Sequence, residues 1–124
     1  MSFQLVATAT SIAAFLLGIG WMFAGRLLLR RWRMEPHDDG LVVGRRIGVV
    51  YFGISILLFL GRSAPPSELR TAISIGVLIA LVMLAVLGIF EFASKRTGPA
   101  ILVSVALEVV LSAGFVWVLA TGAG

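Results

Sequence analysis

Four long apolar runs take up most of this chain, and they limit its possible folds more than any other feature. The runs 3–25, 71–90 and 100–120 are each about as long as the roughly 20 residues that a helix needs to cross a hydrocarbon core of about 30 Å. Charged residues make up 13% of the 124 residues, which is about half of the roughly 25% found in a soluble domain. The sequence therefore predicts an all-α integral membrane protein, an up-down bundle of four transmembrane helices that forms a single domain, 1–124.

The second run is the shortest, and it determines where the spans are expected to lie. Its uncharged part, 47–61, is too short to cross a bilayer alone, so the span has to include preceding residues, and this places Arg45 and Arg46 at the interface. Pro36 ends the preceding helical pattern, and residues 35–40 are expected to form a hydrated turn. The expected spans are 3–25, 43–61, 70–91 and 99–120, with a cytoplasmic juxtamembrane helix and loop at 26–42.

The basic residues predict the orientation. Of the ten lysines and arginines, all except Arg62 and Arg70 lie in 26–46 and 91–99, so the positive-inside rule makes these two segments cytoplasmic and both termini external. We expect the protein in the plasma membrane, meaning the inner membrane of a bacterium. The net charge of +4 comes from basic residues that flank apolar segments, which favours anionic lipid over nucleic acid as the partner. The residues expected to bind lipid headgroups are Arg26, Arg30, Arg31, Arg33 and Arg46.

Small residues recur at helical spacing in three of the runs. Such ridges let neighbouring helix backbones approach closely, so they predict the faces that pack inside the bundle. The predicted faces are Thr10, Ala14 and Gly18 in the first run; Gly44, Gly48, Tyr51 and Ser55 in the second; and Ala72, Gly76, Ala80, Met83, Leu87 and Glu91 in the third.

The last run carries an acid, Glu108, in its middle. Ser104 and Ser112 lie four residues before and after it, so the three side chains are expected to form one polar stripe on the helix. An ionisable group near the bilayer centre costs several kcal/mol unless it faces a bundle interior or a wet cavity. We therefore expect Glu108 to face inward, to be protonated, and to accept or donate hydrogen bonds with groups such as Tyr51, Ser104 or Ser112.

Glu108 admits two interpretations that the sequence leaves open. It could be a functional group, acting as a proton relay, a polar anchor for a ligand or the floor of a half-channel; or it could be a structural carboxyl that fixes helix register. Arg45 and Glu91 are both expected at the cytoplasmic edge of the membrane, so we predict an ion pair between them. The residues predicted to form a polar site within the membrane are Glu108, Ser104, Ser112, Tyr51, Ser55, Arg45 and Glu91.

No catalytic, metal or cofactor site is predicted. The chain has no cysteine, no phosphate-binding loop and no nucleophile motif, and its single histidine, His37, lies in an acidic turn without metal-ligand spacing. The predicted function is non-enzymatic: binding of a hydrophobic ligand or lipid, or service as an accessory subunit of a membrane complex. The alternative is a small transporter or channel, coupled to protons or ions through Glu108 and acting as a homo-oligomer.

Three features resemble one family. Gly44-Arg-Arg-Ile-Gly48 leading into Tyr51, the turn Arg62-x-x-Pro65-Pro66 and the acid in the last span are similar to features of the DoxX-like small four-helix membrane proteins, including their uncharacterised relatives. The resemblance covers about 35–120. It implies an up-down four-helix bundle and, for many members, no defined activity. This chain lacks redox residues, so an oxidoreductase-subunit role is not carried over.

Overall fold

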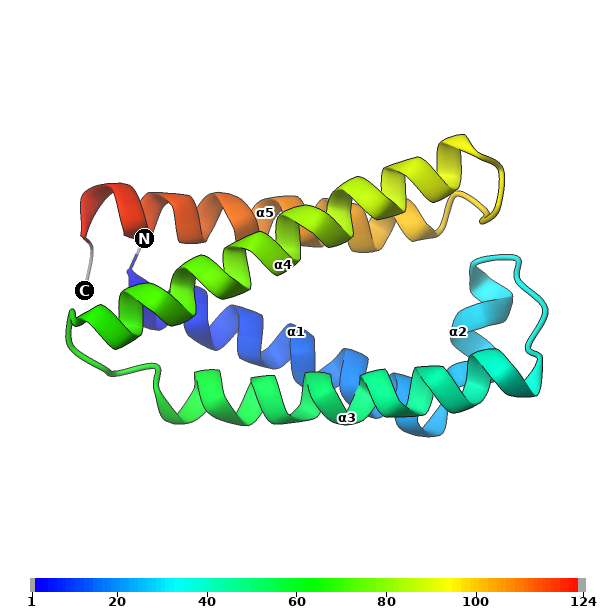
Figure 1. The fold of residues 1–124 in the computed structure, drawn as a ribbon, viewed down its shortest axis with the longest axis horizontal. Helices are drawn as coiled ribbons and strands as arrows, with labels where there is room; N and C mark the ends of the chain where they lie inside the picture. The colour runs from blue at the N-terminus through cyan, green and yellow to red at the C-terminus, as the bar shows by residue number, and fades with distance from the viewer. Residues whose placement is uncertain (1, 123–124) are drawn as a thin grey trace.

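The computed structural model describes residues 2–122, so the ends of the predicted domain, residues 1 and 123–124, lie outside it. Its described part is all-α, as predicted, and four of its helices are long and apolar enough to cross a membrane. In chain order the helices are α1 (Phe3–Phe23), α2 (Gly25–Arg31), α3 (Asp38–Leu60), α4 (Glu68–Ala93) and α5 (Ile101–Thr121) (Figure 1).

The four long helices form two pairs. α1 packs along α3, and α4 packs along α5, while a smaller contact between α1 and α5 joins the pairs. α3 and α4 follow one another in the chain but make no close backbone contact with each other anywhere along their described lengths. In the described part of the chain, α3 and α4 are therefore not packed directly against each other.

Glycines explain the close packing of α1 on α3. A Cβ atom on Gly18 would lie 2.8 Å from the carbonyl oxygen of Gly48, and a Cβ on Gly48 would lie 2.8 Å from the carbonyl oxygen of Gly18. In the same interface the Ser11 hydroxyl donates a hydrogen bond of 2.7 Å to the carbonyl of Ser55. Gly18 of the face predicted for the first run, and Gly48 and Ser55 of the face predicted for the second, thus lie where α1 packs on α3, whereas Tyr51 of the second face lines a cavity.

The face predicted for α4 is wrong. Ala72, Gly76 and Ala80 are exposed, and a Cβ on Gly76 would meet nothing within 4 Å. The side of α4 that packs on α5 includes Gly88 instead, where a Cβ would lie 2.6 Å from Cγ2 of Val105. Small residues permit a close approach, but α3 does not approach this side of α4, and Gly76 and Ala80 line a cavity.

The segment between α1 and α3 differs from the prediction in length. α1 ends at Phe23, the juxtamembrane helix α2 covers only Gly25–Arg31, and α3 already begins at Asp38. Asp38 and Asp39 lie in the first turn of α3, where carboxylates are favoured by the positive end of the helix dipole. The non-helical segment is therefore 32–37, which begins and ends three residues earlier than the expected 35–40, and α3 extends well beyond the uncharged part of its sequence.

The two ends of the bundle are held differently. At the end near the N-terminus, α1, α4 and α5 share a hydrophobic core that includes Phe3, Leu81 and Phe115. Arg70, which is only 7% exposed, lies over the Phe3 ring at 4.3 Å and donates to the Ala64 carbonyl. At the other end, the backbone N–H of residue 98 donates to the carbonyl of residue 32 at 2.8 Å, which connects the turn after α2 to the turn between α4 and α5.

Candidate ligand-binding site

A cavity of about 310 Å³ lies between the two helix pairs. All four long helices contribute to its wall, and most of the side chains that line it are aliphatic. The polar side chains in the wall are Thr10, Tyr51 and Glu108. We call this space the apolar cavity. Its lining from α3 includes Ile54 and Leu57, and its lining from α4 includes Ile73, Gly76, Val77, Ala80, Leu81 and Leu84.

A second cavity of about 190 Å³ adjoins the first and reaches Trp32, directly after α2. Both are lined by Tyr51 and Glu108, together with Leu17, Leu84 and Leu107, so these residues mark the junction. We call the second space the aromatic cavity, because its wall also contains Trp21 and Trp32. The centroids of these two rings are 5.6 Å apart, and the rings meet edge to face.

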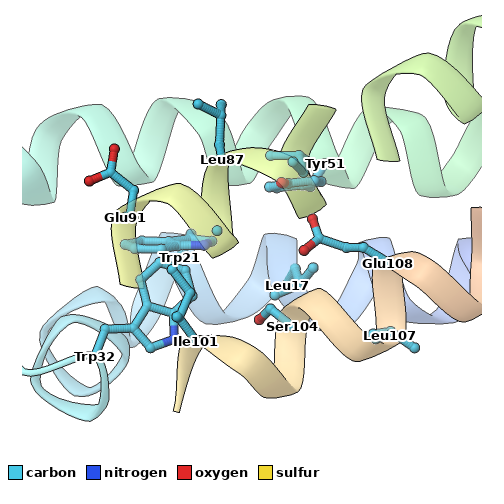
Figure 2. A pocket seen from close by; sticks show the side chains of 12 residues that line it. Leu17, Trp21, Trp32, Tyr51, Leu87, Glu91, Ile101, Ser104, Leu107 and Glu108 are labelled. Atoms are coloured by element: carbon cyan, nitrogen blue, oxygen red, sulfur yellow. The ribbon is translucent and has the colours of Figure 1, made fainter. Parts of the chain in front are cut away.

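Glu108 lies at the junction of the two cavities (Figure 2). Its carboxyl points from α5 toward the Tyr51 ring on α3 (Figure 2). Both side chains are half-buried, and in the described part of the chain neither of them makes a hydrogen bond. The inward position predicted for Glu108 agrees with this structure, whereas the predicted hydrogen bonds from Tyr51, Ser104 or Ser112 are not formed.

The predicted serine stripe divides between two environments. Ser104 lines the aromatic cavity, whereas Ser112 is buried outside both cavities, and its hydroxyl has no hydrogen-bond partner among the described residues. Each step of four residues rotates a side chain by about 40° around a helix, so two such steps separate Ser104 from Ser112 by about 80°. Ser55, also predicted for the site, is buried in the α1–α3 interface, where its hydroxyl donates to the Phe52 carbonyl at 2.7 Å.

The predicted ion pair between Arg45 and Glu91 is wrong. Glu91 lines the aromatic cavity and pairs instead with Arg96, at 3.3 Å. Arg45 is exposed and lies near Asp38 in a separate surface depression beside α1. The two residues do not meet because α3 and α4 are separated along their lengths, which a prediction based on membrane depth alone does not take into account.

Trp21, Trp32 and Thr10 were not predicted as members of the site. Thr10 was assigned only to helix packing, yet it also lines the apolar cavity; its side chain is 5% exposed, and its hydroxyl has no hydrogen-bond partner in residues 2–122. Trp32, which follows α2, lines the aromatic cavity. One signal could have revealed Trp21: it lies three residues after Gly18, and therefore close to the same helix face as the small-residue ridge.

The arginines predicted to bind lipid headgroups are all exposed. Four of them, Arg26, Arg30, Arg31 and Arg33, lie in α2 or directly after it, and Arg46 lies in the first half of α3. Arg33 also packs on the turn between α4 and α5, since a Cβ on Gly98 would lie 2.7 Å from its Cδ. Lipid binding by these side chains stays a prediction.

Comparison of this chain with protein-family models, with curated proteins and with solved structures finds no match. The resemblance to the DoxX-like proteins therefore stays a prediction. The chemistry of the site has to be read from its own residues. An apolar space with two carboxyl groups, one phenol and two indole rings can enclose a hydrocarbon group and bind one polar or charged group beside it.

Proposed function

We propose that this protein is a non-enzymatic integral membrane protein that binds an apolar or amphiphilic molecule between its two helix pairs. The observation that supports this most directly is the apolar cavity of about 310 Å³, whose wall is aliphatic apart from a few polar groups. Ligand sites in proteins are commonly clefts of about 300–1,000 Å³ with mostly apolar walls and a small number of placed polar groups.

The ligand would enter from the bilayer, between α3 and α4. Leu57 on α3 and Gly76 and Ala80 on α4 all line the apolar cavity and are exposed, and α3 and α4 make no close backbone contact, which favours an opening of the cavity between these two helices. In a membrane that surface faces lipid chains. An apolar molecule could therefore pass from the lipid into the cavity without crossing water.

A transporter or channel is less well supported. The shared core of α1, α4 and α5, including Phe3, Leu111 and Phe115, occupies only part of the end of the bundle near the N-terminus. Beside it lies a further cavity of about 340 Å³, whose wall includes Phe3, Ser67 and Arg70. A path for ions would have to connect Glu108 with the polar groups at that end, Ser67 and Arg70. The residues that this cavity shares with the apolar cavity are the aliphatic Leu57 and Ile73, so an apolar stretch separates those polar groups from Glu108. Ion flux into protein-containing liposomes that Glu108→Gln abolishes would overturn the binding-module proposal in favour of the transporter or channel.

We also propose that the protein lies in the plasma membrane, the inner membrane of a bacterium, with both termini external and 26–46 and 91–99 cytoplasmic. The distribution of lysine and arginine supports this orientation. The exposed arginines of 26–33 would then contact anionic lipid, which is more abundant in cytoplasmic leaflets. A larger membrane complex or a homo-oligomer is compatible with the many exposed apolar side chains of α4.

Two glycines offer a matched test of the binding proposal. Gly76 lines the apolar cavity and Gly53 does not, yet both lie inside long helices, and a Cβ on either would meet nothing within 4 Å. Gly76→Phe therefore fills the cavity, whereas Gly53→Phe adds the same ring to the outside of α3.

The probe is a long-chain alcohol that carries a photoactivatable diazirine, added to liposomes that contain the protein. Labelled peptides are mapped by mass spectrometry. We expect the wild-type protein to be labelled at cavity residues such as Leu57, Ile73 and Leu84. Labelling of these residues should be severalfold lower in Gly76→Phe and unchanged in Gly53→Phe. Uniform labelling of all lipid-facing residues, or equal labelling in the two variants, would refute the proposal.

A further inference from the structure

The aromatic cavity has a composition that favours one charge in its ligand. Trp21, Trp32 and Tyr51 supply three aromatic rings, and Glu91 and Glu108 supply two carboxyl groups. Within the described chain, no lysine, arginine or histidine lines either this cavity or the apolar cavity. The wall therefore offers several groups that attract a cation and none that attracts an anion.

Aromatic rings attract cations through the negative potential of their faces. The attraction is worth about 0.5–1 kcal/mol at exposed sites and about 2 kcal/mol or more where water is excluded, and several rings around one space are the usual means of binding quaternary ammonium groups. Trp21 and Trp32 meet edge to face with their centroids 5.6 Å apart, and both are half-buried in the wall. The rings are thus placed on one side of the space while Glu108 and Tyr51 border the other (Figure 2).

The two carboxyl groups differ in how far their charge is already compensated. Glu91 has an ion-pair partner, Arg96, at 3.3 Å. Glu108 has neither an ion pair nor a hydrogen bond within residues 2–122, although it faces an apolar space. A carboxylate in such surroundings is strongly stabilised by a cation, which makes Glu108 the principal charged group available to a ligand.

We propose that the ligand of this site is a lipophilic cation, meaning an amine or quaternary ammonium group attached to a hydrocarbon body. The charged group lies in the aromatic cavity beside Glu108, Tyr51 and Trp21, and the hydrocarbon body extends into the adjoining apolar cavity. This inference rests on the proposed function, since it names the chemical class of the molecule that the apolar cavity binds.

The test compares three competitors that have the same chain and different head groups. The competitors are dodecyltrimethylammonium, dodecan-1-ol and dodecyl sulfate, and each competes with the diazirine alcohol for labelling of the cavity residues. The assay uses phosphatidylcholine liposomes at high salt. The amount of each competitor is expressed as the fraction that is bound to the membrane. We expect the cation to reduce labelling by half at a membrane concentration at least tenfold lower than either the alcohol or the sulfate requires.

Substitutions then assign the preference to residues. Glu108→Gln should remove most of the preference for the cation while the alcohol still labels the cavity, and Glu68→Gln, which changes an exposed carboxyl in the first turn of α4, should leave the preference intact. Trp21→Leu should weaken competition by the cation severalfold and competition by the alcohol less. If Glu108→Gln does not fold, the comparison of head groups in wild-type protein still decides the matter.

The outcomes separate the two proposals. Equal competition by the three molecules, or a preference for the sulfate, would overturn the cation inference and leave the proposed function standing. A preference for the cation that Glu108→Gln leaves unchanged in folded protein would overturn the assignment to Glu108. Absence of specific cavity labelling in wild-type protein would overturn both proposals.

Discussion

Replacing Gly48 by alanine tests whether the two glycines at the crossing of α1 and α3 hold these helices together. The added Cβ would lie 2.8 Å from the carbonyl oxygen of Gly18 and 3.0 Å from the backbone nitrogen of Met22. Both atoms belong to the backbone of α1, so neither can move away by rotation of a side chain. The two helices would have to separate by several tenths of an ångström.

That separation affects the whole interface. Overpacking a well-packed interior costs about 1–3 kcal/mol, and the Ser11 to Ser55 hydrogen bond, at 2.7 Å in the same interface, would be lengthened. A net hydrogen bond contributes about 0.5–1.5 kcal/mol. We therefore expect Gly48→Ala to lower the free energy of unfolding by about 2–3 kcal/mol, reduced somewhat by the better helix propensity of alanine.

Gly53→Ala is the matched control in the same helix. A Cβ at Gly53 meets nothing within 4 Å, so only the propensity term remains, and we expect a gain of roughly 0.5–1 kcal/mol. Both variants can be unfolded in mixed micelles by increasing the fraction of a denaturing detergent while helix content is followed by circular dichroism. Equal unfolding midpoints for Gly48→Ala and Gly53→Ala would refute the reasoning, because they would mean that α1 and α3 are not in close backbone contact.

Gly88→Ala should destabilise the protein by about 1 kcal/mol, which is less than Gly48→Ala because the added Cβ would lie 2.6 Å from a side chain, that of Val105. Adding Val105→Ala to this variant should restore most of the lost stability in the detergent assay. No restoration would contradict the contact between Gly88 and Val105. Competition by dodecyltrimethylammonium should strengthen as the pH rises from about 5 to 8, because protons and the cation compete for Glu108. The titratable groups that face the cavities are Tyr51, Glu91 and Glu108. A preference for the cation that is independent of pH in both the wild type and Glu108→Gln would reject this coupling. A reporter enzyme that functions only outside the cytoplasm should be active when it is fused to the C-terminus, and one that functions only in the cytoplasm should be inactive there. The opposite result would reverse the proposed orientation.

The sequence predicted most of the secondary structure correctly because bilayer-length apolar runs leave few alternatives to helices. It also predicted the packing face of α1 and α3. There, Gly18 and Gly48 belong to small-residue ridges that do meet, so the spacing of residues along one helix was sufficient. The inward position of Glu108 followed from the energy of placing a carboxyl in hydrocarbon.

Other parts of the site depended on which helices are neighbours. Periodicity tells which residues share a face of one helix, but it does not tell which neighbouring helix covers that face. The ridge around Gly76 was expected to pack against a helix and instead borders a cavity, because α4 packs on α5 and not on α3. The same separation leaves Arg45 away from Glu91, which pairs with Arg96.

The sequence by itself determined that this chain forms four membrane-length helices and that one of them carries an inward-facing acid, because the cost of exposing polar backbone and charge to lipid depends on composition and length alone. The tertiary structure decided that the helices associate as two pairs with a cavity between them, and that Trp21, Trp32, Tyr51 and Glu108 come from four different helices or turns to line one continuous space. That arrangement depends on contacts between residues far apart in the chain, such as the close approach of the backbones at Gly18 and Gly48.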